Sequence, residues 1–266
     1  MLRFYRECVN NRVDAFIAHE SNTYEQNFFS ASRNRVVVLN SFDLASYTQS
    51  QGVPTSFTRG AALESYFSQV NYNYDSKYYF TASVRRDGSS RFRSEKWGTF
   101  GSIGGSWIMS KESFLADSKN INFLKLKTSY GLIGDQQGVG LWPGFDTYDV
   151  TDLNGDYSVT IKDNGNRDLT WETAKIFQVG VESSLFGFLD VNLDYYIKNT
   201  DDLIFQRRTP PSSGVALVTV NDGQLRNTGL EFDLKAQVIK HSGTGFNLEL
   251  AVNGEYLKNE ITTMPI

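Results

Sequence analysis

The chain has 266 residues, a formal net charge of −4 and a single cysteine. The acidic balance argues against a protein that grips the phosphate backbone of a nucleic acid, and one cysteine excludes an internal disulfide framework or a cysteine-based zinc site. Aromatic residues make up 14% of the chain alongside 22 glycines and 5 prolines, a composition that suits pleated strands and turns.

The N-terminal segment, MLRFYRECVNNRVDAF, is not expected to be a signal peptide. It lacks a basic stretch followed by an apolar run and a small-residue cleavage site. No stretch of the chain approaches the roughly 20 apolar residues that a membrane helix requires. These patterns leave a transmembrane β-barrel open, because barrel strands alternate apolar with polar residues.

Alternation with a period of two predicts an all-β, antiparallel fold. In residues 66–74, for example, Tyr66, Val70 and Tyr74 fall on one face and Gln69 on the other. The nine predicted strands lie near residues 12–20, 64–74, 77–85, 98–109, 122–132, 172–183, 189–198, 227–238 and 245–258.

The connections between these strands alternate in length. The longest, 21–63, 133–171 and 199–226, fall at one end of the predicted sheet, and short ones such as 75–76 and 184–188 fall at the other. This asymmetry is typical of an up-and-down outer-membrane barrel, with long external loops and short periplasmic turns. Strands of about 9 to 12 residues also suit a tilted crossing of the hydrocarbon layer.

The two faces of the strands differ in chemistry, so the apolar positions are predicted to face lipid and the polar ones the lumen. The predicted lumen-facing residues are Lys125, Lys127, Gln178, Glu182, Asp190, Asn192, Asp194, Glu231, Asp233 and Lys235. An interfacial aromatic girdle is predicted from residues near strand ends, namely Tyr66, Tyr74, Tyr78, Trp107, Tyr130, Trp171, Tyr195 and Tyr256. The alternative is that these rings form the core of a soluble β protein.

No established catalytic pattern occurs in the sequence. The glycines of GTFGSIGGSW lie inside a strand pattern, where glycine marks bends or bulges instead of a phosphate loop. His19 and His241 lie too far apart in sequence to suggest a metal pair. The segment DLNGD offers Asp152, Asn154 and Asp156 as alternating oxygen ligands, but it lacks the glycine and glutamate of a calcium loop, so an Asx-rich turn is favoured.

The segment 133–171 is too long to be an idle connection in a compact domain, which favours a binding role. Its aromatic residues could stack on sugar rings, pack under a partner lid, or hold the loop together, and the last role is favoured. These residues are Trp142, Phe145, Tyr148 and Tyr157.

Residues 62–115, ALESYFSQVNYNYDSKYYFTASVRRDGSSRFRSEKWGTFGSIGGSWIMSKESFL, closely resemble the signature of SusC/RagA-type TonB-dependent outer-membrane transporters. The resemblance continues through 123–136, 169–186 and 189–204 and covers roughly residues 60–260. The following loop adds a spaced set, Pro211, Gly214, Asn221, Gly223, Asn227 and Gly229. The most specific part is the motif Arg85, Arg86, Asp87, Gly88, Ser89, Ser90, Arg91 and Phe92, with Trp97 after it.

The surroundings of this motif are also predicted. The strand 77–85 should end at the motif, the loop 86–96 should follow, and Trp97 should open the next strand at the outer membrane interface. The clustered arginines are expected to pair with Asp87 and Glu95 at a polar rim instead of binding a nucleic acid.

The resemblance implies a barrel of about 22 strands in outer-membrane lipid, plugged by an N-terminal domain. It further implies import of a glycan or peptide, driven by the TonB complex, together with a SusD-like lipoprotein and without a cofactor or catalysis. With nine predicted strands and no recognisable plug, TonB box or signal peptide, residues 1–266 are expected to be a partial barrel domain.

Two other functions are left open. One is a soluble β-sandwich carbohydrate-binding module that uses the loops 133–171 and 199–226. The other is a glycan-cleaving enzyme, for which the sequence offers no candidate carboxylate pair.

Overall fold

The computed structural model describes residues 1–52, 54–154, 156–240 and 245–264, with the backbone alone for Asp152 and Leu153. Within these ranges the chain forms one ten-stranded antiparallel sheet and three two-stranded hairpins. No helix in the described ranges has the length and apolar character to cross a membrane. The ten-stranded sheet and the three hairpins make the fold all-β, as predicted.

The large sheet is an unbroken wall in which neighbours in space follow one another in sequence, apart from the inserted hairpins. Its strands are β1 (Leu2–Cys8), β2 (Asn11–Ser30), β5 (Thr55–Tyr74), β6 (Tyr78–Ser89), β7 (Trp97–Ile108), β8 (Ile121–Asp135), β11 (Glu172–Leu185), β12 (Leu189–Asp201), β15 (Gln224–Ile239) and β16 (Leu248–Thr263). The hairpins pair β3 (Arg33–Val36) with β4 (Tyr47–Ser50), β9 (Thr147–Leu153) with β10 (Asp156–Asp163), and β13 (Ile204–Arg208) with β14 (Leu217–Asn221). Short 3-10 turns are η1 (Leu44–Ser46), η2 (Met109–Lys111) and η3 (Pro211–Ser213).

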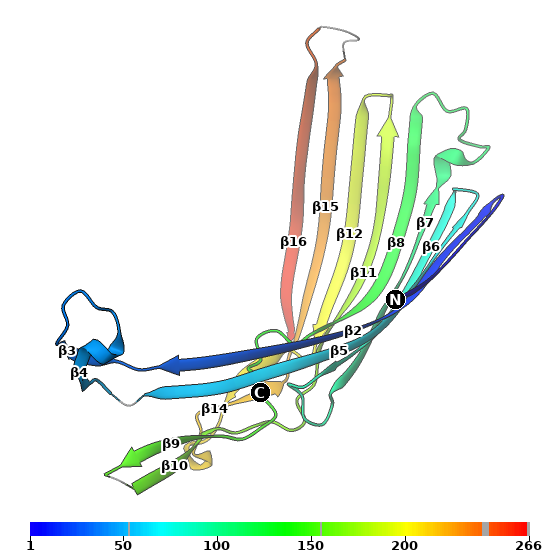
Figure 1. The fold of residues 1–266 in the computed structure, drawn as a ribbon. Coiled ribbons are helices and arrows are strands. Elements are labelled where there is room, and N and C mark those ends of the chain that lie inside the picture. The colour runs from blue at the N-terminus through cyan, green and yellow to red at the C-terminus, as the bar shows by residue number, and fades with distance from the viewer. Residues whose placement is uncertain (53, 155, 241–244, 265–266) are drawn as a thin grey trace.

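The wall is curved and open, with β1 along one border and β16 along the other (Figure 1). All three hairpins lie beyond the same end of the sheet, which we call the long-loop end; the opposite end is the turn end. This parity confirms the predicted alternation of long and short connections. Because the chain forms one curved sheet and not two packed ones, the fold rules out a β-sandwich.

Cross-strand register gives the wall one polar face. Lys127 lies opposite Gly180, which lies opposite Asp194, which in turn lies opposite Glu231. All ten residues predicted to face the lumen share this face, and several form ion pairs there. Lys127 Nζ lies 2.9 Å from Asp194 Oδ2 and 3.2 Å from Glu182 Oε1.

The opposite face of the wall is apolar and uncovered. Leu193 is 42% exposed and Leu250 is 55% exposed, and apolar neighbours surround them along β12, β15 and β16. A soluble protein seldom exposes so broad an apolar surface to water. Lipid contact explains it, because the hydrocarbon layer is the solvent that favours such side chains.

Aromatic rings border this apolar band at both ends. At the turn end the Tyr78 ring stacks on Tyr74 and Trp107 at 6.2 Å in each case, and nearer the long-loop end Tyr66 lies 6.2 Å from Trp97. On β7 the two tryptophans are separated by about 33 Å along the strand, or about 25 Å at a tilt near 40°, which matches the height of a barrel's apolar band.

Three sequence predictions about strands need correction. The wall has ten strands and not nine, because β1 was missed. Residues 21–30 and 55–63, predicted as loop, extend β2 and β5 beyond the lipid band. There both faces are wet, so polar pairs such as Thr58 with Asn27 hold the register and the period-two signal disappears. Strand β6 also runs past Arg85 to Ser89.

Candidate functional site at the long-loop end

The first half of the family motif lies within β6, where neighbouring side chains point to opposite faces. Arg85 lies on the polar face: its Nε donates to Asp87 Oδ1 at 2.6 Å and its Nη2 to Ser65 Oγ at 2.9 Å. Asp87 is buried. The predicted pairing of an arginine with Asp87 is confirmed, whereas Glu95 forms no ion pair with any residue that the structure describes.

Arg86 and Gly88 lie on the apolar face. The guanidinium of Arg86 lies 5.4 Å from the centre of the Trp97 ring, a cation–π arrangement. A Cβ atom at Gly88 would come within 2.9 Å of three Trp97 ring atoms, so only glycine leaves room for the indole. Trp97 opens β7, as predicted, and its side chain lies on the apolar face of the wall.

The second half of the motif leaves the wall and forms hydrogen bonds to the connection that follows β8. Ser89 Oγ donates to Gln136 Oε1, and Arg91 Nη1 donates to the carbonyl of Val139 at 3.1 Å. Ser90 instead ties the turn to β5, because its Oγ accepts from the backbone N–H of Ala62 at 2.9 Å.

Phe92 ends the motif in a small buried core. Its side chain is fully buried and its ring lies 5.1 Å from that of Trp171, whose Nε1 donates to the Lys96 carbonyl at 3.2 Å. The ring of Phe100 also packs against Trp171, at 5.6 Å, and a Cβ at Gly134 would lie 1.9 Å from the phenyl ring of Phe100. Trp171 was predicted in the aromatic girdle; the structure places it in this core instead, because it lies just before β11 and its ring packs against Phe92 and Phe100.

Asn221, from the hairpin β13–β14, closes the arrangement. Its Oδ1 accepts from the Thr170 N–H at 2.7 Å, and its Nδ2 donates to the carbonyls of Thr170 and Asp202 at 2.9 Å each. Three connections, 90–96, 136–171 and 202–223, therefore meet the end of the wall at one place. We call the residues Ser89, Arg91, Phe92, Trp171 and Asn221 the loop junction.

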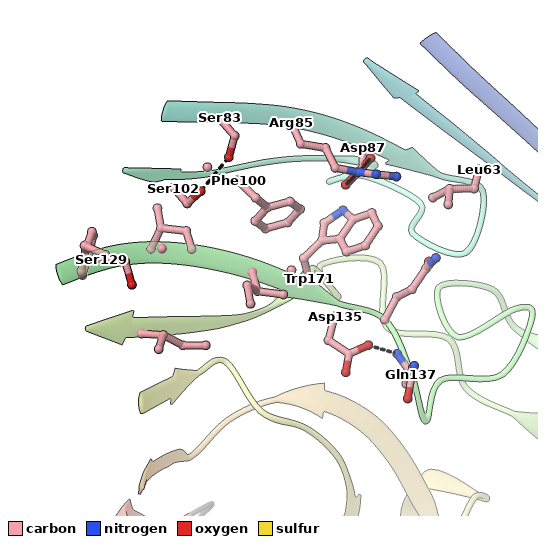
Figure 2. A pocket seen from close by; sticks show the side chains of 18 residues that line it. Leu63, Ser83, Arg85, Asp87, Phe100, Ser102, Ser129, Asp135, Gln137 and Trp171 are labelled. Atoms are coloured by element: carbon pink, nitrogen blue, oxygen red, sulfur yellow. Dashed lines mark hydrogen bonds and ion pairs between the residues drawn. The ribbon is translucent and has the colours of Figure 1, made fainter. Parts of the chain in front are cut away.

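A hollow of about 720 Å³ lies beside this junction on the polar face (Figure 2). Arg85, Asp87 and Trp171 border the hollow. Ser83 and Ser102 also line it, and their hydroxyl oxygens are hydrogen-bonded to each other at 2.7 Å; their small side chains leave this space unfilled. The hollow would open toward the lumen of a closed barrel.

A second hollow of about 640 Å³ lies among the loops, and we call it the loop cleft. Three of the four predicted loop aromatics, Trp142, Phe145 and Tyr148, line it. Trp142 and Phe145 meet edge to face at 6.4 Å. Tyr157 does not join them: it is 88% exposed on the hairpin β9–β10, so the four rings do not form one cluster.

Asp152, Asn154 and Asp156, for which an Asx-rich turn was favoured over a calcium site, lie near the end of β9, in the turn and at the start of β10. The side chain of Asp152 and the whole of Gly155 lie outside the described residues, as does His241. Asn154 adopts a left-handed backbone with φ of 57°, as in a tight hairpin turn. Among described residues, no three His, Cys, Asp or Glu side chains gather as metal ligands.

The partners of the motif were not predictable from local sequence. Gln136 and Val139 offer backbone carbonyls or a single amide, and such contacts leave no periodic pattern. The resemblance singled out Asn221 as one of a spaced set, but the sequence did not indicate which segments it would join.

Comparison with known proteins identifies the wall. The family model "TonB dependent receptor-like, beta-barrel" matches residues 6–263. The chain belongs to this family. TonB-dependent receptors of this kind lie in the outer membrane, so the apolar face of this receptor wall faces outer-membrane lipid.

Named relatives place the receptor chain among SusC/RagA-type proteins. It is 36% identical over 224 residues to TonB-dependent receptor P3 of Formosa agariphila, covering 80% of this chain and 22% of the relative. It is 32% identical over 232 residues to the TonB-dependent receptor SusC of Bacteroides thetaiotaomicron, covering 79% and 22%. The chain thus spans about a fifth of the length of these curated relatives.

Solved structures agree with this family. The RagAB peptide importer in its closed-closed state matches with a TM-score of 0.90 and 27% identity, over 99% of this chain and 30% of that one. The outer membrane transporter YddB of Escherichia coli matches with a TM-score of 0.64 at 10% identity, over 97% and 32%, which shows the shared fold alone.

Proposed function

We propose that this receptor imports a nutrient, an oligosaccharide or a peptide, across the outer membrane by a TonB-dependent mechanism. Residues 1–266 supply part of its barrel domain. The structural match to the RagAB peptide importer over 99% of the chain carries the proposal. No reaction is assigned: the relatives are receptors, and the motif residues serve packing and loop attachment instead of bond-breaking chemistry.

The polar face of the wall supports a transport path. Its ion pairs and amides would meet water and a polar solute inside a closed barrel, whereas the apolar face meets lipid. The energy for import would come from the TonB complex acting on a plug domain, as the family resemblance implies.

A SusD-like surface lipoprotein is the proposed partner. Two apolar surfaces project from the long-loop end, where an external partner would sit. On the hairpin β9–β10, Val150 is 65% exposed and Val159 is 62% exposed, and near the tip of the β2–β5 pair Phe42 is 98% exposed. Exposed apolar patches of this kind mark sites of protein association.

The test is uptake by cells that make the full-length receptor. Deletion of the receptor gene should abolish growth on one class of oligosaccharide or peptide, and loss of TonB should have the same effect. A tagged receptor should co-purify a surface lipoprotein, and the paired substitutions Val150→Asp and Val159→Asp should weaken that association. Growth and uptake that persist without TonB would refute the proposal.

A further inference from the structure

We propose that the loop cleft is a preformed binding site for a neutral oligosaccharide, with Trp142 and Tyr148 as the sugar-stacking residues. This inference deepens the proposed function and rests on it, because it names the substrate class that the receptor would capture first. The reasons are the construction of the cleft, its exposed rings and its balanced charge.

The cleft is built from segments that are each attached elsewhere. On one side β5 contributes Phe57, whose ring stacks on Phe28 at 4.9 Å, and Arg59, which lies 4.6 Å from the centre of the Phe57 ring. Arg59 Nε also donates to Gln26 Oε1 at 2.7 Å. These contacts fix that side of the cleft before any ligand arrives.

The other lining segments are held by the loop junction and by contacts of Asn166 and Arg93 near it. Arg91 Nη1 donates to the Val139 carbonyl, in the segment that leads from β8 to Trp142. Strand β14 is held by Asn166, whose Nδ2 donates to the Thr219 carbonyl at 3.0 Å. Arg93 lies 5.2 Å from the centre of the Phe145 ring, under the same loop. A site held in its binding shape loses less ordering entropy when a ligand enters.

Two of the lining rings keep a face open. Trp142 is 47% exposed and Tyr148 is 57% exposed, although both line a hollow of about 640 Å³. The negative π-face of such a ring attracts the weakly positive C–H groups on the flat side of a pyranose. Polar groups at the rim, such as the Gln206 amide, can then donate to or accept from the hydroxyls.

The charges around the cleft cancel. Two cations, Arg59 and Lys162, and two carboxylates, Asp149 and Asp163, are the charged groups among its lining residues. Lys162 Nζ lies 3.0 Å from Asp149 Oδ1, which raises the pKa of Lys162, and Asp163 Oδ2 accepts from Thr147 Oγ1 at 2.8 Å.

Because the cations and carboxylates of the cleft are balanced in number and already bound to neighbouring side chains, they exert little net electrostatic attraction on a charged ligand. A uronic-acid chain or a peptide with free termini would have to break one of these contacts, with a loss of affinity. A neutral, hydroxyl-rich chain needs no such exchange.

The test is isothermal titration of the full-length receptor in detergent. The probes are neutral hexasaccharides of glucose, xylose and mannose, an acidic hexasaccharide of galacturonic acid, and an end-capped hexapeptide. We expect at least one neutral hexasaccharide to bind, and Trp142→Ala or Tyr148→Ala to weaken it by about tenfold or more. Trp142→Phe should keep most of the affinity because it keeps an aromatic face.

Tyr157→Ala is the matched control, since Tyr157 lies on the same hairpin as Tyr148 but outside the cleft. It should leave binding unchanged. The proposal is overturned if no neutral hexasaccharide binds, or if Trp142→Ala leaves the affinity unchanged. It is also overturned if the acidic sugar or the peptide binds with an affinity that Trp142→Ala lowers. TonB-dependent uptake measured on the same variants separates the transport function from the proposed sugar site. If uptake persists although the binding results contradict the sugar site, the transport function stands and only the sugar site in the loop cleft is refuted.

Discussion

At the scale of single residues, the motif that marks the family has a structural explanation at nearly every position. Arg85 and Asp87 pair on the polar face, Gly88 makes room for Trp97 on the apolar face, and Phe92 fills the core of the loop junction. Their shared role is to attach long loops to the end of a thin wall. The motif is therefore a positioning device for the loops.

Gly88→Ala should destabilise the barrel by about 1–3 kcal/mol, the range for an overpacked site, because its Cβ would press on the Trp97 indole. The matched control is Gly105→Ala on β7, where the nearest atom to a new Cβ is 3.7 Å away. Unfolding of the full-length receptor by urea in lipid vesicles would compare the two. Equal stability of both variants would contradict the proposed fit of the indole over Gly88.

A second residue-scale prediction concerns Glu112 at the turn end. Hydrogen bonds from the Tyr78 hydroxyl at 2.6 Å and from Trp107 Nε1 at 3.1 Å hold the pKa of Glu112 below its ordinary value of 4.5. Because the pKa of Glu112 is lower in the folded state than in the unfolded state, its ionised form stabilises the fold at pH values above the unfolded-state pKa. That stabilisation is lost as the pH falls through the folded-state pKa.

Thermal unfolding of the receptor in detergent tests this pH dependence. The advantage of the unsubstituted receptor over Glu112→Gln should be constant above about pH 5 and should shrink as the pH falls below about 4.5. Glu95→Gln is the control, because Glu95 forms no ion pair with the described residues. An advantage that stays constant down to about pH 3 would refute the assigned role of Glu112.

At the scale of secondary-structure elements, alternation assigned faces correctly where one face meets lipid and the other meets water. The same rule failed on the outer halves of β2 and β5, where water meets both faces. It also missed β1, whose apolar face is interrupted by Arg6 and whose register depends on β2, where Arg3 Nη2 pairs with Asp14 Oδ2 at 2.6 Å. Pairing partners, not local pattern, defined these strands.

Charge placement on β15 tests the face assignment. Phe232→Arg should cost about 2–4 kcal/mol of folding free energy near the midplane of the bilayer, whereas Asp233→Arg should cost little, since that side chain lies on the polar face beside Asn192 and Asn253. Folding titrations into lipid vesicles would measure both. If the two adjacent substitutions cost the same, the assignment is wrong.

The hairpin β13–β14 offers a test of the loop junction. Asn221→Ala removes three hydrogen bonds to backbone groups of two segments, so the loops 136–171 and 202–223 should exchange amide hydrogens faster while the wall strands stay protected. Hydrogen exchange read by mass spectrometry would show it. The control is Asn34→Ala on the exposed hairpin β3–β4, and equal exchange in the two variants would count against the junction.

At the scale of the whole molecule, the sheet has no self-sufficient core. The buried cluster of Phe92, Phe100, Val139, Leu169 and Trp171 lies at one end, and the rest of the wall is a single layer with two faces exposed. Its borders, β1 and β16, carry unpaired backbone groups, which are costly in lipid unless further strands pair with them.

Residues 1–266 expressed alone should consequently be insoluble without detergent or denaturant, because the apolar face and both borders would be exposed to water. Size-exclusion chromatography of the soluble and detergent-extracted fractions would check this. A monodisperse soluble product without detergent would contradict the assignment of the apolar face to lipid.

The sequence by itself determined the all-β class, the two faces of most strands, the parity of long and short connections, and the family, because each of these is written in local periodicity or in an ordered motif. Only the tertiary structure decided that Trp171 belongs to a core and not to the girdle, and that Phe57 and Arg59 line the loop cleft together with Trp142. These contacts join residues far apart in the chain through backbone groups and packed rings, which leave no repeating pattern in the sequence.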